Sequence, residues 1–157
     1  MTKISLAVVS AALAVGMAAP VVAGVNDPEV IIYRFPGVTD NGGGFELGIA
    51  TAFHCTNFSG ATENIRFATR RSDGGLVSNA VFPIAHLATL SVSTHNTGAY
   101  VEPMVLNTNM VTQGTTAIAA TSINVICTAM TIDASALVPI GVALRGIRFS
   151  PVPGSQE

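Results

Sequence analysis

Hydrophobic and polar residues alternate strictly along residues 45–56. The odd positions carry the side chains expected to face a core, namely Phe45, Leu47, Ile49, Thr51, Phe53 and Cys55. A period of two places alternate side chains on opposite faces of a β-strand. The pattern therefore predicts a half-buried strand over this whole segment, and it is the clearest structural signal in the chain.

Shorter runs of the same kind predict more strands. Residues 30–35 form a β-branched and aromatic run that stops at Pro36. Residues 65–70 and 76–82 flank the turn sequence SDGG and are expected to pair as a hairpin. Another strand is expected at 89–94, on a background rich in serine and threonine.

The second half of the chain is less regular. Residues 95–113 lack sustained periodicity, so we expect a long loop there, and loops of that length usually have a function. Residues 116–133 are apolar on both faces, which predicts two central strands separated near Ser122. The alternation from residue 140 to 149 changes phase at Arg145-Gly146, which indicates a β-bulge.

These segments together predict an all-β fold. Only residues 134–138 and the N-terminal segment have a pattern compatible with a helix, against seven or eight candidate strands. The spacing of the turns favours a two-layer antiparallel β-sandwich of immunoglobulin-like character. A closed β-barrel is the alternative.

The first 23 residues have the layout of a secretory signal peptide. Lys3 precedes an apolar run from residue 4 to about residue 19, and a small residue, Ala23, ends the segment. A retained membrane anchor fits less well, because the run is near the lower length limit for a span and contains a glycine and a proline. We therefore expect cleavage after Ala23, and a single soluble domain over 24–157 that is secreted or periplasmic.

Charge and composition narrow the class of partner. Lys3 is the only lysine, so the segment after the leader carries six arginines against nine acidic residues. This balance argues against nucleic acid or an anionic membrane surface as a partner. Only 10% of the chain is charged and 49% is hydrophobic, so its surface is expected to be weakly polar. A surface of that kind often contacts another molecule.

The two cysteines are expected to form a disulfide. On a strand, Cys55 would face the core beside Phe53, and His54 would point away from both. Cys127 lies in the most apolar segment of the chain, which is a poor environment for a thiolate. In an exported protein with two cysteines, we expect Cys55 and Cys127 to be bonded and to join the two sheets.

Copper binding is an alternative function. The histidines show none of the spacings typical of metal sites, but His86, His95, Met104 and Met110 could together provide soft ligands for copper. The simpler interpretation is that the histidines are surface residues and the methionines fill gaps.

An enzymatic function has little support. The sequence contains no G-x-S-x-G motif, which marks many serine hydrolases. Glu46 and Glu63 could be a glycan-cleaving pair, but the chain has no tryptophan and only two tyrosines to provide the aromatic platform that sugars require. The basic residues Arg66, Arg70 and Arg71 are expected to form a solvated face paired with Glu46 or Glu63. We therefore expect no catalytic, cofactor-binding or metal-binding residues, and an unrecognised hydrolase is the least favoured hypothesis.

The segments around the two cysteines resemble those of a group of small exported bacterial proteins without an assigned activity. The first segment, Thr51 to Ser59, has the form T-x-F-x-C-T-N-x-S, and the second, Ala120 to Ala129, has an isoleucine ahead of C-T-A. The resemblance covers most of the mature chain and implies an exported, disulfide-bonded β-sandwich. It implies no catalytic residues.

The sequence as a whole predicts a non-enzymatic exported β-sandwich that acts through its surface in adhesion, in the envelope or in assembly. The expected partner is a protein or a glycan. Self-association through an exposed strand edge is a further expectation, because such an edge can pair with a neighbouring chain.

Overall fold

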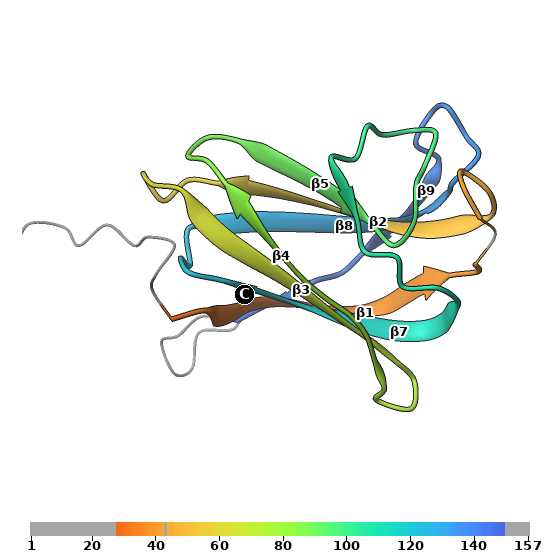
Figure 1. Cartoon of the computed structure of the whole chain (residues 1–157), viewed down its shortest axis with the longest axis horizontal. Coiled ribbons are helices and arrows are strands. Elements are labelled where there is room, and N and C mark those ends of the chain that lie inside the picture. Colours follow the sequence, from red (N-terminus) through yellow and green to blue (C-terminus); the bar gives the residue numbers. More distant parts are fainter. Residues whose placement is uncertain (1–27, 43, 150–157) are drawn as a thin grey trace, which may run out of the picture.

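The computed structural model describes residues 28–42 and 44–149, so the predicted signal peptide at residues 1–23 lies outside the described residues. Within them, two five-stranded sheets pack face to face (Figure 1). One sheet has the order β10 (Ile147–Arg148), β1 (Val30–Asp40), β7 (Val111–Ala120), β3 (Glu63–Arg71) and β4 (Leu76–Ile84). The other has the order β6 (Met104–Val105), β5 (Thr89–Ser93), β2 (Ile49–Asn57), β8 (Val125–Asp133) and β9 (Gly141–Leu144).

The predicted two-layer sandwich is confirmed, and the sheets do not close into a barrel. All pairings are antiparallel except the short contact between β5 and β6. The core contains a row of aromatic rings from both sheets, with neighbouring centroids 5.6 to 6.0 Å apart: Tyr33, Phe35, Phe53, Phe67 and Phe82. Burial of these large side chains is the main source of stability for the two layers.

Most of the predicted strands are present. The hairpin of β3 and β4, the strand β5 and the separation of β7 from β8 near Ser122 agree with the sequence pattern. The predicted loop over 95–113 contains the short strand β6 and the start of β7. None of the described residues is helical, and residues 134–138 form a turn in which the Asp133 carboxylate accepts a hydrogen bond from the Ser135 N–H at 2.9 Å.

The strand predicted from residue 45 begins only at Ile49. Glu46 has φ 53° and Gly48 has φ 77°, so the chain turns twice before it becomes extended. Gly48 also lies against Asn41, where an added Cβ would fall 2.2 Å from a side-chain oxygen. As a result, Phe45 and Leu47 are exposed by 69% and 57% although they follow the core-facing pattern.

The outer face of β2 is buried over half its length. Ala50 and Ala52 point away from the other sheet, yet they are 0% and 1% exposed. The segment 94–103 crosses this face and places Tyr100 against His54 on β2. This covering explains why both faces of β2 are apolar at its start.

The end of β1 differs from the prediction. β1 continues through Pro36, which pairs with Thr115 of β7; its other side has no neighbour there, because β10 pairs only with Tyr33 and Arg34. A proline is tolerated at such an open edge. The register of β1 shifts directly afterwards, at Gly37.

The phase change at Arg145-Gly146 is a crossing between the sheets and not the predicted β-bulge. β9 pairs with β8 in one sheet, and β10 pairs with β1 in the other. Gly146 makes the crossing possible, because an added Cβ would lie 2.4 Å from the buried ring of Phe35. The two phases therefore belong to different sheets.

Cys55 and Cys127 form the predicted disulfide, but it joins two strands of the same sheet. The two residues are register partners on β2 and β8, with their Cα atoms 4.1 Å apart. The expectation of a bond between the sheets is therefore wrong. Both cysteines are buried, as expected from the alternation around Cys55 and from the apolar segment around Cys127, but neither pattern gives information on which sheet a strand joins.

Candidate functional site

The residues considered for copper binding are dispersed. His86 precedes β5, where its Nδ1 accepts a hydrogen bond from the Gly60 N–H at 3.0 Å, whereas His95 follows β5 at the opposite end of the sandwich. Met104 and Met110 are exposed by 49% and 57%. The described part of the chain holds no group of three or more His, Cys, Asp or Glu residues placed for a metal ion. The four residues therefore do not form one site.

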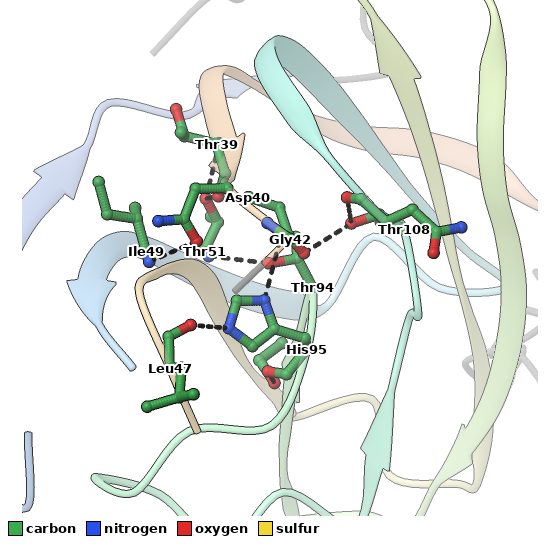
Figure 2. A network of polar contacts seen from close by, with 12 residues as sticks. Thr39, Asp40, Gly42, Leu47, Ile49, Thr51, Thr94, His95 and Thr108 are labelled. Atoms are coloured by element: carbon green, nitrogen blue, oxygen red, sulfur yellow. Dashed lines mark hydrogen bonds and ion pairs between the residues drawn. The ribbon is translucent and has the colours of Figure 1, made fainter. Parts of the chain in front are cut away.

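The buried carboxylate of Asp40 is the centre of a polar network at one end of the sandwich (Figure 2). Its Oδ1 accepts a hydrogen bond from the Gly42 N–H at 2.7 Å, and its Oδ2 accepts one from the Thr108 hydroxyl at 3.0 Å. His95 Nδ1 lies 3.0 Å from Oδ1, without the alignment of a hydrogen bond, and pairs electrostatically with the carboxylate when the ring is protonated. Asp40 therefore connects three segments that are distant in sequence.

This network lacks the geometry of a nucleophilic triad. The Thr108 hydroxyl is bonded to Asp40, and His95 Nε2 lies 3.0 Å from the Leu47 carbonyl oxygen, so neither ring nitrogen contacts a hydroxyl. A nucleophilic hydroxyl requires a direct hydrogen bond to the base. The adjacent pocket of about 140 Å³ is also smaller than a usual small-molecule site. We interpret the network as structural, because it holds the end of β1 at Asp40 to the segments that contain His95 and Thr108.

The carboxylates considered for glycan cleavage lie far apart. Glu46 precedes β2 and Glu63 follows it, so roughly 25 Å of strand separates them. This is well beyond the spacing of paired catalytic carboxylates. Glu63 is fully buried and accepts a hydrogen bond from the Thr121 hydroxyl. The two residues cannot act on one bond.

The arginine cluster forms a partly solvated face, but its acidic partner differs from the prediction. Arg66 pairs with Glu29, and its Nε lies 2.6 Å from a carboxylate oxygen. Arg70 donates to the Gly74 carbonyl at 2.8 Å in the hairpin turn. Glu46 and Glu63 take no part in these contacts, because one lies at the far loop and the other faces the core.

His54 lies in a second polar cluster, on the outer face of the sheet that contains the disulfide. Its Nδ1 is 2.9 Å from the Ser91 hydroxyl, and its Nε2 is buried without a hydrogen-bond partner. The ring of Tyr100 packs edge to face on the imidazole, with the centroids 4.5 Å apart. Tyr100 also donates its hydroxyl hydrogen to Met130 Sδ at 3.1 Å. The alternation placed His54 on this face but did not indicate that a distant loop covers it.

We expect His54 to make stability depend on pH. Burial lowers its pKa below the ordinary value of 6.5, and the charge of Glu102 opposes this shift more weakly. The unfolded chain then binds the proton more readily, so stability is complete above pH 6.5 and falls as the pH decreases toward the folded-state pKa. Urea unfolding at about pH 7.5 and about pH 5 measures the loss.

His54→Gln should reduce this acid-dependent loss, because glutamine does not titrate. His86→Gln is the matched control, since His86 is exposed and should leave the loss unchanged. An equal acid-dependent loss in wild type and His54→Gln would contradict the assignment.

The loops after β1, β5 and β8 meet at one end of the sandwich (Figure 1). Exposed apolar side chains lie on these loops and on the adjoining β9. Backbone hydrogen bonds of 2.7 Å hold these loops together, from Ala134 N–H to the Gly48 carbonyl and from Gly98 N–H to the Ala134 carbonyl. The group, here called the apolar end, consists of residues exposed by 57% to 97%: Phe45, Leu47, Val101, Leu137, Val138, Ile140 and Val142.

The apolar end continues into an open sheet edge. β9 pairs with β8 on one side and is the last strand of its sheet on the other. Its sequence, Gly-Val-Ala-Leu, contains neither a charge nor a proline, the usual features that protect an edge strand from pairing. Sequence reasoning placed Ile140 and Val142 on one face of a strand, but whether that strand lies at an edge depends on topology.

The described residues contain no helix of the length and apolar character needed to cross a membrane. Comparison of the whole chain with protein-family models, with characterised proteins and with solved structures found no match in any of the three.

Proposed function

We propose that this protein is an exported, non-enzymatic, immunoglobulin-like binding module that engages a protein partner through the apolar end and the adjoining edge of β9. The observation that carries the proposal is the exposure of a continuous apolar segment, from Leu137 at 83% to Val142 at 70%, beside an unpaired strand edge. Large exposed apolar patches on soluble domains commonly mark interaction sites.

The chemistry of this surface favours a protein over a glycan. Sugar recognition usually relies on stacked aromatic rings and polar side chains. The apolar end is dominated by aliphatic residues, and Phe45 is its one aromatic member. Aliphatic side chains beside free backbone donors and acceptors suit the addition of a strand from another polypeptide. Such a strand would gain main-chain hydrogen bonds along β9.

The two histidine clusters support a non-enzymatic role. At His95 both ring nitrogens face acceptor oxygens. At His54 one ring nitrogen is buried without a partner, and the ring packs against Tyr100. Neither arrangement combines a nucleophile, a base and an orienting acid.

A charge on the open edge should weaken the interaction. Val142 is 70% exposed, so Val142→Lys should fold normally while it disfavours pairing of a new strand with β9. We expect its affinity for the partner to fall by about tenfold or more, a cost of about 1.4 kcal/mol. Light scattering after size-exclusion chromatography over a concentration series measures self-association. Binding of the labelled mature protein to the envelope of the cell that exports it tests for a partner other than a second copy of the chain.

Leu76→Lys is the matched control, because Leu76 is 48% exposed on β4, the edge strand on the opposite side of the sandwich. This variant should behave as wild type in both measurements. A wild-type protein that stays monomeric at all concentrations and binds no protein at the envelope would refute the proposal, as would equal losses in the two variants.

A further inference from the structure

The unpartnered Nε2 of His54 points to a function beyond protein binding. Two ring nitrogens of the described histidines are buried without a hydrogen bond, His54 Nε2 and His95 Nδ1. His95 Nδ1 has an oxygen of the Asp40 carboxylate 3.0 Å away. His54 Nε2 forms no ion pair of this kind among the described residues, and Glu102 interacts with the ring only as a more distant charge. A buried polar nitrogen without a partner carries a desolvation cost, which a bound ligand can offset.

The other nitrogen of His54 is already held. Nδ1 lies 2.9 Å from the Ser91 hydroxyl, and when the ring is neutral with its hydrogen on Nδ1, Ser91 accepts that hydrogen. Nε2 then carries the free lone pair. This matches the usual state of a metal-binding histidine, in which the nitrogen that does not bind the metal donates a hydrogen bond and so orients the ring.

A thioether lies on the same outer face of the sheet as His54. Met130 on β8 is the register partner of Ala52 on β2, so it occupies the same outer face as His54, one diagonal position away. Tyr100 contacts both residues, with its ring on His54 and its hydroxyl 3.1 Å from Met130 Sδ. The imidazole and the thioether are therefore gathered under one aromatic side chain.

We propose that His54 Nε2 and Met130 Sδ bind one Cu(I) ion beneath Tyr100. A neutral imidazole and a thioether are the ligands that a soft monovalent cation prefers, whereas zinc and calcium need more nitrogen, thiolate or oxygen ligands. Such a cluster of ligands is absent from the described residues. The carboxylate of Glu102, which interacts electrostatically with His54, adds a favourable negative charge. His54 lies on β2, which β8 separates from β9, whereas Met130 on β8 is the register partner of Ala143, so the site borders β9 on the side away from its open edge.

The test uses Ag(I), a surrogate that needs no reductant, so the disulfide remains intact. The mature protein is titrated with silver nitrate in chloride-free buffer and followed by native mass spectrometry and by the ring ¹⁵N signals of the histidines. We expect one bound ion and a shift of the His54 Nε2 signal. His54→Gln and Met130→Leu should each weaken binding by about tenfold or more. A Cu(I) titration against a competing chelator should give the same ranking.

His86→Gln and Met104→Leu are matched controls on exposed residues and should bind as wild type. The proposal is overturned if wild type binds no ion at micromolar concentration, if the bound ion shifts only other histidines, or if the control variants lose binding while His54→Gln and Met130→Leu retain it. Met130→Leu preserves side-chain volume, so it reports on the ligand even where His54→Gln disturbs the packing around Tyr100.

Discussion

Replacing both cysteines, by Cys55→Ala and Cys127→Ala, is expected to lower the free energy of unfolding by about 4 kcal/mol. The disulfide spans 72 residues of sequence, so its loss restores a large conformational entropy to the unfolded chain. The folded state should remain a sandwich, because β2 and β8 also pair along their whole length from Ile49 to Asn57. A loss of this size is a large part of the stability of a domain of this length.

Urea unfolding measures the effect, and reduction provides the control. Wild type in reductant should unfold at nearly the same urea concentration as the double variant, whereas reductant should leave the variant unchanged. A wild-type protein whose midpoint does not move on complete reduction would contradict the structural role of the bond.

Asn57→Ala is expected to cost about 3 kcal/mol of stability. Asn57 is fully buried, and its Nδ2 donates to the Ala61 carbonyl at 2.7 Å and to the Ile84 carbonyl at 2.9 Å. Its Oδ1 accepts from the Ser59 N–H at 2.8 Å. Alanine would remove all three hydrogen bonds at the junction of three segments, and the Ala61 carbonyl would keep only its bond from the Ser59 hydroxyl. The same burial argues against use of the Asn57-Phe58-Ser59 sequence for glycosylation.

Asn79→Ala is the control for this change. Asn79 is exposed and accepts one hydrogen bond from Arg66, so its loss should alter stability by less than about 0.5 kcal/mol. Asn57→Asp keeps the acceptor but loses both donors, so it should be destabilised as well. If urea unfolding gave Asn57→Ala the same free energy of unfolding as Asn79→Ala, the structural role assigned to the Asn57 hydrogen bonds would be refuted.

Local pattern was sufficient to predict the fold class and most strands, whereas the pairing of the cysteines was predicted from their number and the expected export. Period-two alternation reports which side chains share a face, and Phe53 and Cys55 face the core as expected. The start of β2 was predicted too early, because Glu46 and Gly48 adopt positive φ angles that the hydrophobic pattern does not reveal.

Long-range arrangement could not be predicted in the same way. The sheet to which a strand belongs depends on pairing between distant segments, which explains the error over the disulfide. The candidate sites depend even more on how segments distant in sequence are placed together. Tyr100 reaches His54 and Met130 only because the loop after β5 returns over its own sheet, and no spacing in the sequence encodes that return.

The position of β1 limits when this domain can fold. Its two neighbours, β7 and β10, both follow residue 110, and β8, the central partner of β2, lies between them in the sequence. During synthesis, the first strand therefore has no sheet to join until most of the chain has emerged. Under the export that we propose, this order would delay folding until most of the chain has been made and would keep the polypeptide competent for translocation.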